Sequence, residues 1–292
     1  MFNHIPDSIE LIDYIDDGEK ARHYFFRLLP LKENQIKNNH LQHNWQQVQP
    51  GQFFMLHVPS LGEAPFTFTK APNLKGEFCA FIRKMGQVTS ALFTMKRGDI
   101  LGARGPFGRG WPLEKLQSNN ILIVAGGCGL APLVTLIDGL IDKQINTSEQ
   151  NQTKKQQLVL LYGARNKASQ MLNPERARWQ QHIKILNTLD EYEEEEKNLT
   201  AIQGSPLTII SKGLSAFTSP PKTALLCGPE KMMNSVARYL TVHGLASKDI
   251  FLAVERRMHC AVGLCGHCYI NNKYVCTSGP TFSWQELEQL SN

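Results

Sequence analysis

The chain has 292 residues, of which 42% are hydrophobic and 20% are charged. This composition is typical of a folded globular protein that is long enough for two domains and an appendage. The net charge of +5 comes from scattered Lys and Arg residues, so nucleic-acid binding is not indicated. The N-terminus lacks the basic and apolar regions of a secretory signal, and no stretch approaches about 18 consecutive apolar residues. We therefore expect no membrane span, and a cytosolic protein whose thiols are reduced.

Residues 8–110 contain short β-rich runs that are separated by turns. The expected strands include 52–59, 65–70, 77–84 and 99–108. A helix over residues 88–95 interrupts this series, because Ala, Leu and Met favour helix there. The pattern predicts a small antiparallel β-barrel or sandwich.

After Trp111, apolar runs alternate with helical patterns. Residues 119–142 combine an apolar strand, a Gly-rich turn and a helix, and further apolar runs occupy 157–164, 183–189 and 222–229. Buried strands that alternate with helices predict an α/β doubly wound parallel sheet. The polar run 142–157 and the acidic run 190–197 are expected to be mostly solvated loops. A third segment starts near Phe251, which divides the chain into 1–113, 114–250 and 251–292.

Two turns of the predicted α/β domain have features of a nucleotide site. Gly126, Gly127 and Gly129 stand between a strand and a helix, where backbone N–H groups and the helix N-terminus can meet a pyrophosphate. Pro132 replaces the last Gly of a GxGxxG fingerprint, but Pro is compatible with a first helical turn. Such a corner without a ligand explains this motif nearly as well. A second strand–turn–helix corner at 225–233 makes a nucleotide cleft more credible.

In the first domain, Thr67 and Thr69 alternate with Phe66 and Phe68, so a strand would present hydroxyls on one face and rings on the other. The hydroxyls could hydrogen-bond a flavin, although Thr is also a common strand residue. Downstream, a helix start that could hold a pyrophosphate carries Arg83, Gly86, Gln87, Val88 and Thr89. Spacing alone leaves the ligand-binding and the structural interpretations of both stretches open.

Four of the seven cysteines follow the pattern C-x4-C-x2-C-x7-C, at Cys260, Cys265, Cys268 and Cys276. The first three match the plant-type [2Fe–2S] spacing, which wraps three thiolates around the cluster in one loop. Around Asn271–Asn272 the sequence predicts a tight hairpin, in which Ile270 pairs with Lys273. That register places Cys276 opposite His267 and beside Cys268.

The small residues Gly263 and Gly266 leave room for backbone N–H groups to approach the cluster sulfurs. Structural zinc is an alternative, but zinc sites usually contain two C-x2-C pairs and only one is present. Disulfides do not suit a reducing compartment, and buried core thiols would not require these glycines. The remaining cysteines, Cys79, Cys128 and Cys227, belong to the other two domains and are not expected to be cluster ligands.

Taken in order, these stretches resemble the ferredoxin–NADP reductase-like superfamily, in which a flavin-binding barrel precedes a nucleotide-binding domain. The resemblance is carried by GEAP (62–65), GQVTSALF (86–93), RGPFGRGWP (104–112), VAGGCGLAP (124–132), CGPEKM (227–232), ERRMHCAVGLCGHC (255–268) and YVCTSGP (274–280). The chain is most similar to the gamma subunits of cytosolic [NiFe] hydrogenases (sulfhydrogenases) and to the NADH-oxidising subunit of anaerobic sulfite reductase. More distantly it resembles the electron-transfer subunit of dihydroorotate dehydrogenase.

This resemblance implies an FAD-binding barrel (1–113), an NAD(P)-binding domain (114–250) and a [2Fe–2S] segment (251–292). The residues implied to bind FAD are Pro65, Phe66, Thr67, Phe68, Thr69, Arg83, Gly86, Gln87, Val88 and Thr89. Those implied to bind NAD(H) or NADP(H) are Gly126, Gly127, Gly129, Cys227, Gly228 and Pro229. Ala64 and Phe66 stand where the superfamily has Arg and Tyr, which leaves phosphate neutralisation to Arg83 and keeps FMN open as an alternative flavin.

The implied function is that of an NAD(P)H-dependent flavin oxidoreductase subunit. Hydride would pass from NAD(P)H to the flavin, with Thr67 and Cys227 as the catalytic candidates, and single electrons would pass on to the cluster. Because no site for hydrogen or sulfite is evident, we expect a catalytic subunit and a further iron–sulfur subunit as partners. A nucleotide-binding redox sensor or assembly protein, and a zinc-stabilised flavoprotein, are alternatives. The acidic run from Asp190 favours NAD(H), whereas Arg165 could attract the 2′-phosphate of NADP(H).

Overall fold

The computed structural model of the protein describes residues 5–30, 45–117, 119–148, 156–191, 201–270 and 272–289. These residues form two compact units. The first unit contains the described residues of Met1–Trp111, Ala131–Thr135 and Glu255–Pro280. The second contains those of Pro112–Leu130, Leu136–Val254 and Thr281–Asn292.

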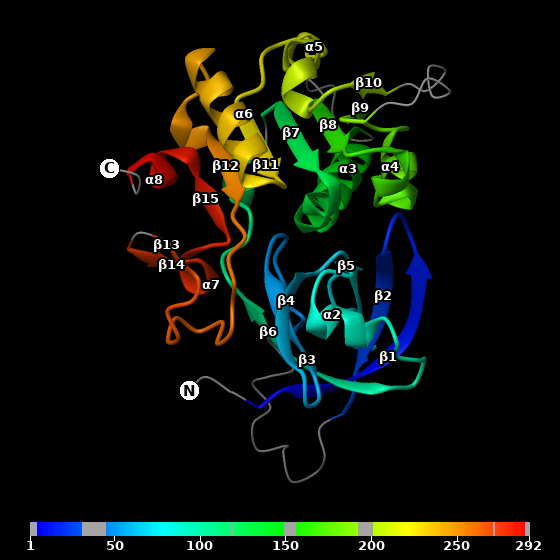
Figure 1. The fold of residues 1–292 in the computed structure, drawn as a ribbon. Coiled ribbons are helices and arrows are strands. Elements are labelled where there is room, and N and C mark those ends of the chain that lie inside the picture. Colours follow the sequence, from blue (N-terminus) through cyan, green and yellow to red (C-terminus); the bar gives the residue numbers. More distant parts are fainter. Residues whose placement is uncertain are drawn as a thin grey trace. The chain divides into compact units, whose positions relative to one another are not determined.

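The first unit is built on a six-stranded antiparallel barrel (Figure 1). Its strands are β1 (Asp7–Asp16), β2 (Ala21–Leu28), β3 (Phe53–Val58), β4 (Gly62–Thr67), β5 (Glu77–Arg83) and β6 (Ile100–Phe107), in the order β4-β3-β6-β1-β2-β5. The two edges of this sheet meet where Lys70, just after β4, bridges Cys79 on β5. Helix α2 (Gln87–Leu92) follows β5. The predicted antiparallel barrel and its helix are therefore confirmed.

Aromatic side chains fill the barrel. The ring of Phe54 lies 4.9 Å from that of Phe68 and 5.3 Å from that of Phe78, and all three are buried. Phe68 and Thr69 lie beyond the end of β4, so the predicted alternation of rings and hydroxyls ends at Thr67. Phe68 is a core residue, because its side chain is only 2% exposed.

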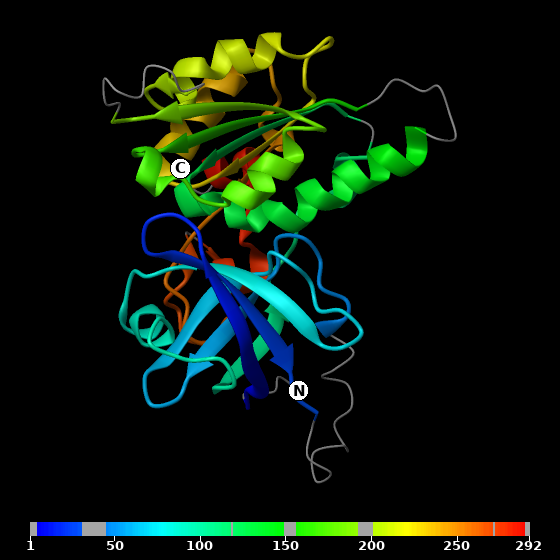
Figure 2. The same ribbon diagram turned by 90° about the vertical axis from the view of Figure 1, so that its right-hand side faces the viewer.

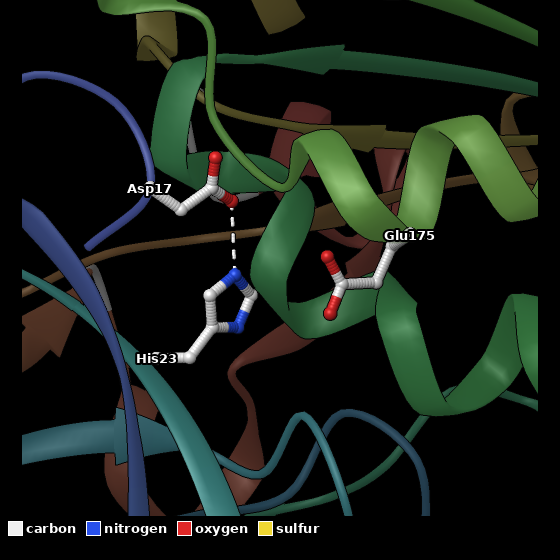
Figure 3. Close-up of side chains that lie close together, drawn as sticks. All are labelled: Asp17, His23 and Glu175. Carbon is white, nitrogen blue, oxygen red and sulfur yellow. Dashed lines mark hydrogen bonds and ion pairs between the residues drawn. The ribbon is translucent and has the colours of Figure 1, made fainter. Parts of the chain in front are cut away.

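The β1–β2 hairpin carries a buried polar pair, with Asp17 in the turn and His23 on β2. Asp17 and His23 are 8% and 7% exposed, and His23 Nε2 lies 2.9 Å from Asp17 Oδ2 (Figure 3). The imidazole ring also packs edge-on against Phe81, with 4.9 Å between ring centroids. Because buried polar groups are costly without partners, this pairing supports the hairpin.

The second unit contains a seven-stranded sheet that is parallel apart from one edge strand. Its strands are β7 (Ile121–Gly126), β8 (Leu158–Ala164), β9 (Lys184–Leu189), β10 (Ile202–Gln203), β11 (Thr223–Cys227), β12 (Ile250–Ala253) and β15 (Thr281–Ser283). The order is β10-β9-β8-β7-β11-β12-β15, with β15 antiparallel to β12.

Helices cover both faces of this sheet (Figure 2). Helices α3 (Val134–Ser148) and α4 (Asn173–Trp179), drawn in green, lie on one face, and α5 (Ile210–Ser215) and α6 (Glu230–Val242), drawn in yellow, lie on the other. Short 3₁₀ helices occupy Leu113–Lys115, Gly127–Leu133, Lys167–Ser169, Pro206–Ile209 and Ser247–Asp249. The predicted doubly wound sheet is confirmed. None of the helices in the described part of the chain has the length and apolar character that a bilayer crossing requires.

Two expectations for this unit need correction. The predicted loop 142–157 begins as helix, because α3 continues to Ser148. Residues 149–155 of that loop and 192–197 of the acidic run lie outside the described residues. In addition, β12 and β15 flank the cysteine segment and both pair in the sheet, so that segment is an insertion between two strands. The division into 1–113, 114–250 and 251–292 by cofactor remains a prediction.

The cysteine segment has its own small elements, β13 (Tyr269–Ile270), β14 (Lys273–Tyr274) and α7 (Val275–Ser278), and α8 (Trp284–Gln289) follows β15 (Figure 1). Ile270 pairs with Lys273 as predicted, while Asn271 lies outside the described residues. The predicted strand pairing of Cys276 with His267 is wrong, because the hairpin ends at Tyr274 and Cys276 lies on α7.

Candidate functional site

The loop that begins at Cys260 is lined by backbone N–H groups that point at sulfur. The amides of Val262, Leu264 and Cys265 donate to Cys260 Sγ over 3.3 to 3.4 Å, and Gly263 donates to Cys276 Sγ over 3.3 Å. Positive φ angles of 60°, 77° and 78° at Ala261, Gly263 and Gly266 turn the backbone so that successive amides face inward. Amide donors of this kind set the potential of protein-bound iron–sulfur clusters.

The four thiols come in two pairs. The Cys265 thiol interacts with that of Cys260, and the Cys276 thiol interacts with that of Cys268 and, more weakly, with that of Cys260. Val275 donates its N–H to the Cys268 carbonyl over 3.0 Å, and this contact returns the chain so that α7 brings Cys276 beside Cys268. The expected proximity of the fourth cysteine therefore arises from a helical turn rather than from a strand.

Burial separates the two pairs. Cys268 and Cys276 are 2% and 1% exposed, whereas Cys265 is exposed. Desolvation raises the pKa of the Cys276 thiol to about 12, while the backbone N–H of His267 lowers the pKa of the Cys265 thiol. Two thiol pairs with amide donors fit a [2Fe–2S] cluster, which takes two protein ligands on each iron.

The structure gives no support to the disulfide alternative. None of the seven cysteines forms a disulfide, and each lies in a described part of the chain. Cys79 is on β5, Cys128 is in the 3₁₀ helix after β7, and Cys227 ends β11. These three positions lie outside the cysteine loop, as predicted.

Sequence reasoning missed the residues that hold this loop to the barrel. Arg104, on β6, forms a two-point ion pair with Glu63 on β4, with 3.0 Å between Nε and Oε1. The same guanidinium donates from Nη1 to the Cys260 carbonyl over 3.3 Å. At the other end of the segment, the Arg109 amide donates to the Gly279 carbonyl. The sequence signals at these positions were the stretches GEAP, RGPFGRGWP and YVCTSGP, which carry the resemblance without revealing these contacts.

Arg83 ends β5, and its side chain has no partner among the described residues. Its Nε is buried without a hydrogen bond, and no described residue forms an ion pair with it. The Arg83 side chain is half-buried, and a buried guanidinium nitrogen without a hydrogen bond is unfavourable, so an anion fits this position. The predicted pyrophosphate of FAD would supply that anion.

At the start of α2, one of the predicted phosphate ligands, Thr89, bonds to the protein itself, whereas Gly86 and Gln87 are exposed. The Thr89 hydroxyl accepts from the amides of Met85 and Gly86 over 2.9 Å each and donates to the Gly86 carbonyl, so it caps the helix. Gly86 and Gln87 are exposed, and Val88 is half-buried. Thr89 therefore has a structural role that the sequence did not indicate, and its phosphate contact remains a prediction.

On β4, Pro65, Phe66 and Thr67 are half-buried, whereas Phe68 and Thr69, just after the strand, are buried. The Thr67 hydroxyl makes no hydrogen bond to another described side chain or carbonyl, and it remains available to a ligand. The amide of Thr69 donates to the Cys79 carbonyl on β5. The end of β4 thus fits a flavin at Pro65 to Thr67, and the flavin contacts of Phe68 and Thr69 remain predictions.

The two predicted nucleotide turns lie side by side, because β7 and β11 are neighbours although they are far apart in the sequence. The strand order reverses between these strands, and such switch points form ligand crevices in doubly wound sheets. The α-helix after β7 starts later than expected, since the 3₁₀ helix Gly127–Leu133 precedes α3. Pro229 is the N-cap of α6.

Close packing explains most of the glycines in these turns. A Cβ on Gly129 would lie 2.5 Å from the Cα of Gly228, and a Cβ on Gly126 would lie 2.9 Å from the Cδ of Pro229. Gly127 differs, because its φ is 54° and a Cβ there would meet nothing within 4 Å. Gly127 therefore faces open space where a phosphate fits, while Gly126, Gly129 and Gly228 let the turns approach each other. Cys227 is 1% exposed, and its contact with a nicotinamide remains a prediction.

The residues considered for coenzyme choice contact each other. Arg165, just after β8, pairs with Glu191, with 2.9 Å between Nε and Oε1. The side-chain Nδ2 of Asn166 donates to the other carboxylate oxygen of Glu191 over 3.3 Å. Glu191 thus neutralises the cation that could attract a 2′-phosphate.

Two family models match different parts of the chain. Residues 123–238 match a family model described as the oxidoreductase NAD-binding domain, and residues 255–288 match the iron–sulfur cluster binding domain of dihydroorotate dehydrogenase B. Both the nucleotide turn after β7 and all four cluster cysteines fall within these matches. The predicted set of FAD, a [2Fe–2S] cluster and NAD(H) or NADP(H) is consistent with them.

Among solved structures, a flavin-based electron-bifurcating NADH-dependent reduced ferredoxin–NADP oxidoreductase shares the fold, with a TM-score of 0.70 and 19% identity over 100% of this chain and 93% of that chain. Ferredoxin–NADP⁺ reductase from Plasmodium falciparum gives a TM-score of 0.63 and 14% identity over 87% of this chain and 99% of that chain. The predicted ferredoxin–NADP reductase-like fold is confirmed.

Curated relatives extend this likeness to sequence. Sulfhydrogenase 1 subunit gamma of Pyrococcus furiosus is 32% identical over 82% of this chain and 80% of its own length. Sulfhydrogenase 2 subunit gamma of the same organism is 31% identical over 86% and 88%. The probable electron-transfer subunit of dihydroorotate dehydrogenase B (NAD⁺) from Thermococcus kodakarensis is 29% identical over 82% and 87%. The chain belongs to the family that includes the sulfhydrogenase gamma subunits and the electron-transfer subunits of dihydroorotate dehydrogenase B.

Proposed function

We propose that this chain is an NAD(P)H-oxidising electron-transfer subunit, which exchanges electrons between NAD(P)H and a partner redox enzyme. Its cofactors would be FAD and a [2Fe–2S] cluster, and its partners would be a catalytic subunit and a further iron–sulfur subunit. The sulfhydrogenase relatives favour a [NiFe] hydrogenase as the partner enzyme. The cytosolic location remains a prediction.

The observation that carries this proposal is the cysteine loop, in which four amides donate to the sulfurs of Cys260 and Cys276. A site with amide donors already in place suits an anionic cluster, and the match to an iron–sulfur binding domain favours a cluster over structural zinc. The exposed Cys265 and the buried Cys268 and Cys276 give the site one side toward solvent and one toward protein. This asymmetry suits electron exchange with an external partner.

In the barrel, Arg83 would neutralise the pyrophosphate of FAD, and Pro65, Phe66 and Thr67 would lie along the isoalloxazine. Gly86, Gln87 and Val88 would bring the start of α2 to the phosphates, with Thr89 fixing that turn through its hydroxyl. When bound, the flavin would couple the two-electron chemistry of a nicotinamide to the one-electron chemistry of a cluster. The protein's contribution is to hold and orient these groups.

In the α/β unit, Gly127 would approach the coenzyme phosphates, and Cys227, Gly228 and Pro229 would border the nicotinamide. Since the Arg165 guanidinium is already paired with the Glu191 carboxylate, we propose NAD(H) as the preferred coenzyme. A 2′-phosphate would have to displace this carboxylate before it could pair with the guanidinium.

The test is an anaerobic titration of the purified full chain with NADH and then with NADPH. Flavin absorption and low-temperature electron paramagnetic resonance are recorded together. Bleaching of the flavin together with growth of a reduced [2Fe–2S] signal is expected, more readily with NADH. Iron that neither coenzyme reduces would favour the redox-sensor alternative. Absence of any cluster signal with dithionite in iron-replete protein would refute the assignment of Cys260, Cys265, Cys268 and Cys276.

A further inference from the structure

A buried ion pair joins the strand proposed for the flavin to the loop proposed for the cluster. The side chain of Arg104 is 6% exposed and that of Glu63 is 17% exposed. Both oxygen atoms of the Glu63 carboxylate accept hydrogen bonds from the guanidinium. This two-point geometry is specific to Arg and fixes the pair in one orientation. Glu63 lies on β4, the strand that also carries Thr67.

The third contact of Arg104 is made to the cluster loop. Its Nη1 donates to the carbonyl of Cys260 over 3.3 Å. The Sγ of Cys260 in turn accepts hydrogen bonds from three backbone N–H groups. Cys260 is thus held from both sides, by the guanidinium at its carbonyl and by the loop at its sulfur. Ala261, which follows, has a φ of 60°, and the Cys260–Ala261 peptide is where the loop turns inward.

We propose that Arg104 and Glu63 are positioning residues for the iron–sulfur cluster, which fix Cys260 and set the electrostatic environment of the cluster. This inference rests on the proposed function, since it requires a [2Fe–2S] cluster on these cysteines. The positive charge of Arg104 is balanced by the negative charge of Glu63. The effect of each charge on the reduction potential of the cluster is therefore offset by that of its partner. Removal of either one exposes the other.

The two charges must act on the cluster in opposite directions. Reduction adds an electron, so a nearby positive charge stabilises the reduced cluster and raises its potential, while a negative charge lowers it. Arg104→Gln leaves the Glu63 carboxylate unbalanced and should lower the midpoint potential. Glu63→Gln leaves the Arg104 guanidinium unbalanced and should raise it. The double variant should lie between the two single variants, near the wild type.

The experiment is a dithionite redox titration of the anaerobically reconstituted full chain, followed by electron paramagnetic resonance. It is run at one fixed pH, because His57 Nδ1 lies 3.8 Å from Glu63 Oε1. The control is Arg97→Gln, which removes the same charge from an exposed ion pair with Asp13 and should leave the potential unchanged. Iron and sulfide content are measured for every variant.

Shifts of opposite sign in the two single variants would support the inference. Shifts of the same sign, or none, would overturn it, because a merely structural role cannot give opposite signs. If Arg104→Gln does not retain its cluster, Glu63→Gln decides alone, and an unchanged or lowered potential counts against the inference. A wild-type chain that forms no cluster refutes the proposed function, which is a separate result from failure of this one.

Discussion

The packing of the two nucleotide turns leads to a prediction about Gly129. In Gly129→Ala, the new Cβ would lie 2.5 Å and 2.6 Å from the Cα and N of Gly228, and 3.0 Å from the carbonyl carbon of Cys227. All three are backbone atoms, so no side-chain rotation can relieve the overlap. Such overpacking costs about 1–3 kcal/mol. In a domain of this size, about 1 kcal/mol corresponds to roughly 2–4 °C, so Tm should fall by about 2–12 °C.

The matched control is Gly139→Ala, which makes the same change on α3. Gly139 is exposed, and a Cβ there meets nothing within 4 Å. Because Gly disfavours helix interiors, this variant should gain about 0.5–1 kcal/mol. Both variants are compared with the wild type by differential scanning calorimetry of the full chain. If Gly129→Ala melts at or above the wild-type temperature while Gly139→Ala is stabilised, the two turns do not pack as described.

Three further predictions concern the ligands. Arg83→Met removes a half-buried guanidinium whose Nε has no described partner, so the apoprotein should keep its stability. FAD affinity should fall about tenfold to hundredfold, which corresponds to the loss of one charge-assisted hydrogen bond. Fluorescence titration and thermal melts measure both quantities, and lost stability with unchanged affinity would contradict the assignment. Glu191→Gln breaks an exposed pair that is worth about 0.2–1 kcal/mol. The ratio of kcat/KM for NADPH to that for NADH should therefore rise about 1.4-fold to fivefold as Arg165 is released, and an unchanged ratio would remove both residues from coenzyme choice. Cys276→Ser should abolish the [2Fe–2S] signal and most of the bound iron, whereas Cys79→Ser on β5 should retain both in iron and sulfide assays.

The sequence was sufficient for features that depend on local pattern. The parallel strands β7, β8 and β11 are buried on both faces and therefore read as continuous apolar runs. The cysteine spacing identified the cluster loop in the same way, because three ligands come from one short stretch. These signals are contained in windows of a few residues and do not require knowledge of the fold.

Features that depend on distant contacts escaped prediction. Strand β15 has only three residues, Thr281–Ser283, and is a strand because β12 lies beside it. The last turns of α3 are polar, and a solvated helix face resembles a loop in sequence. Arg104 reaches residues that are 41 and 156 positions away in the chain, and no local motif records such a contact.

The structure also ranks the ligand-binding residues that the resemblance implied. Thr89 and Gly129 have roles within the protein, the first as a cap and the second in the contact between two turns. Arg83 and Gly127 differ from them, since the Nε of Arg83 has no partner and the space beside Gly127 is open among the residues described. Buried polar groups in folded proteins are nearly always paired, so an unpaired one marks a place where a ligand completes the pairing. Arg83 is therefore the position at which loss of ligand binding should occur with the least loss of fold, whereas a side chain at Gly127 would be strained by the φ of 54° there.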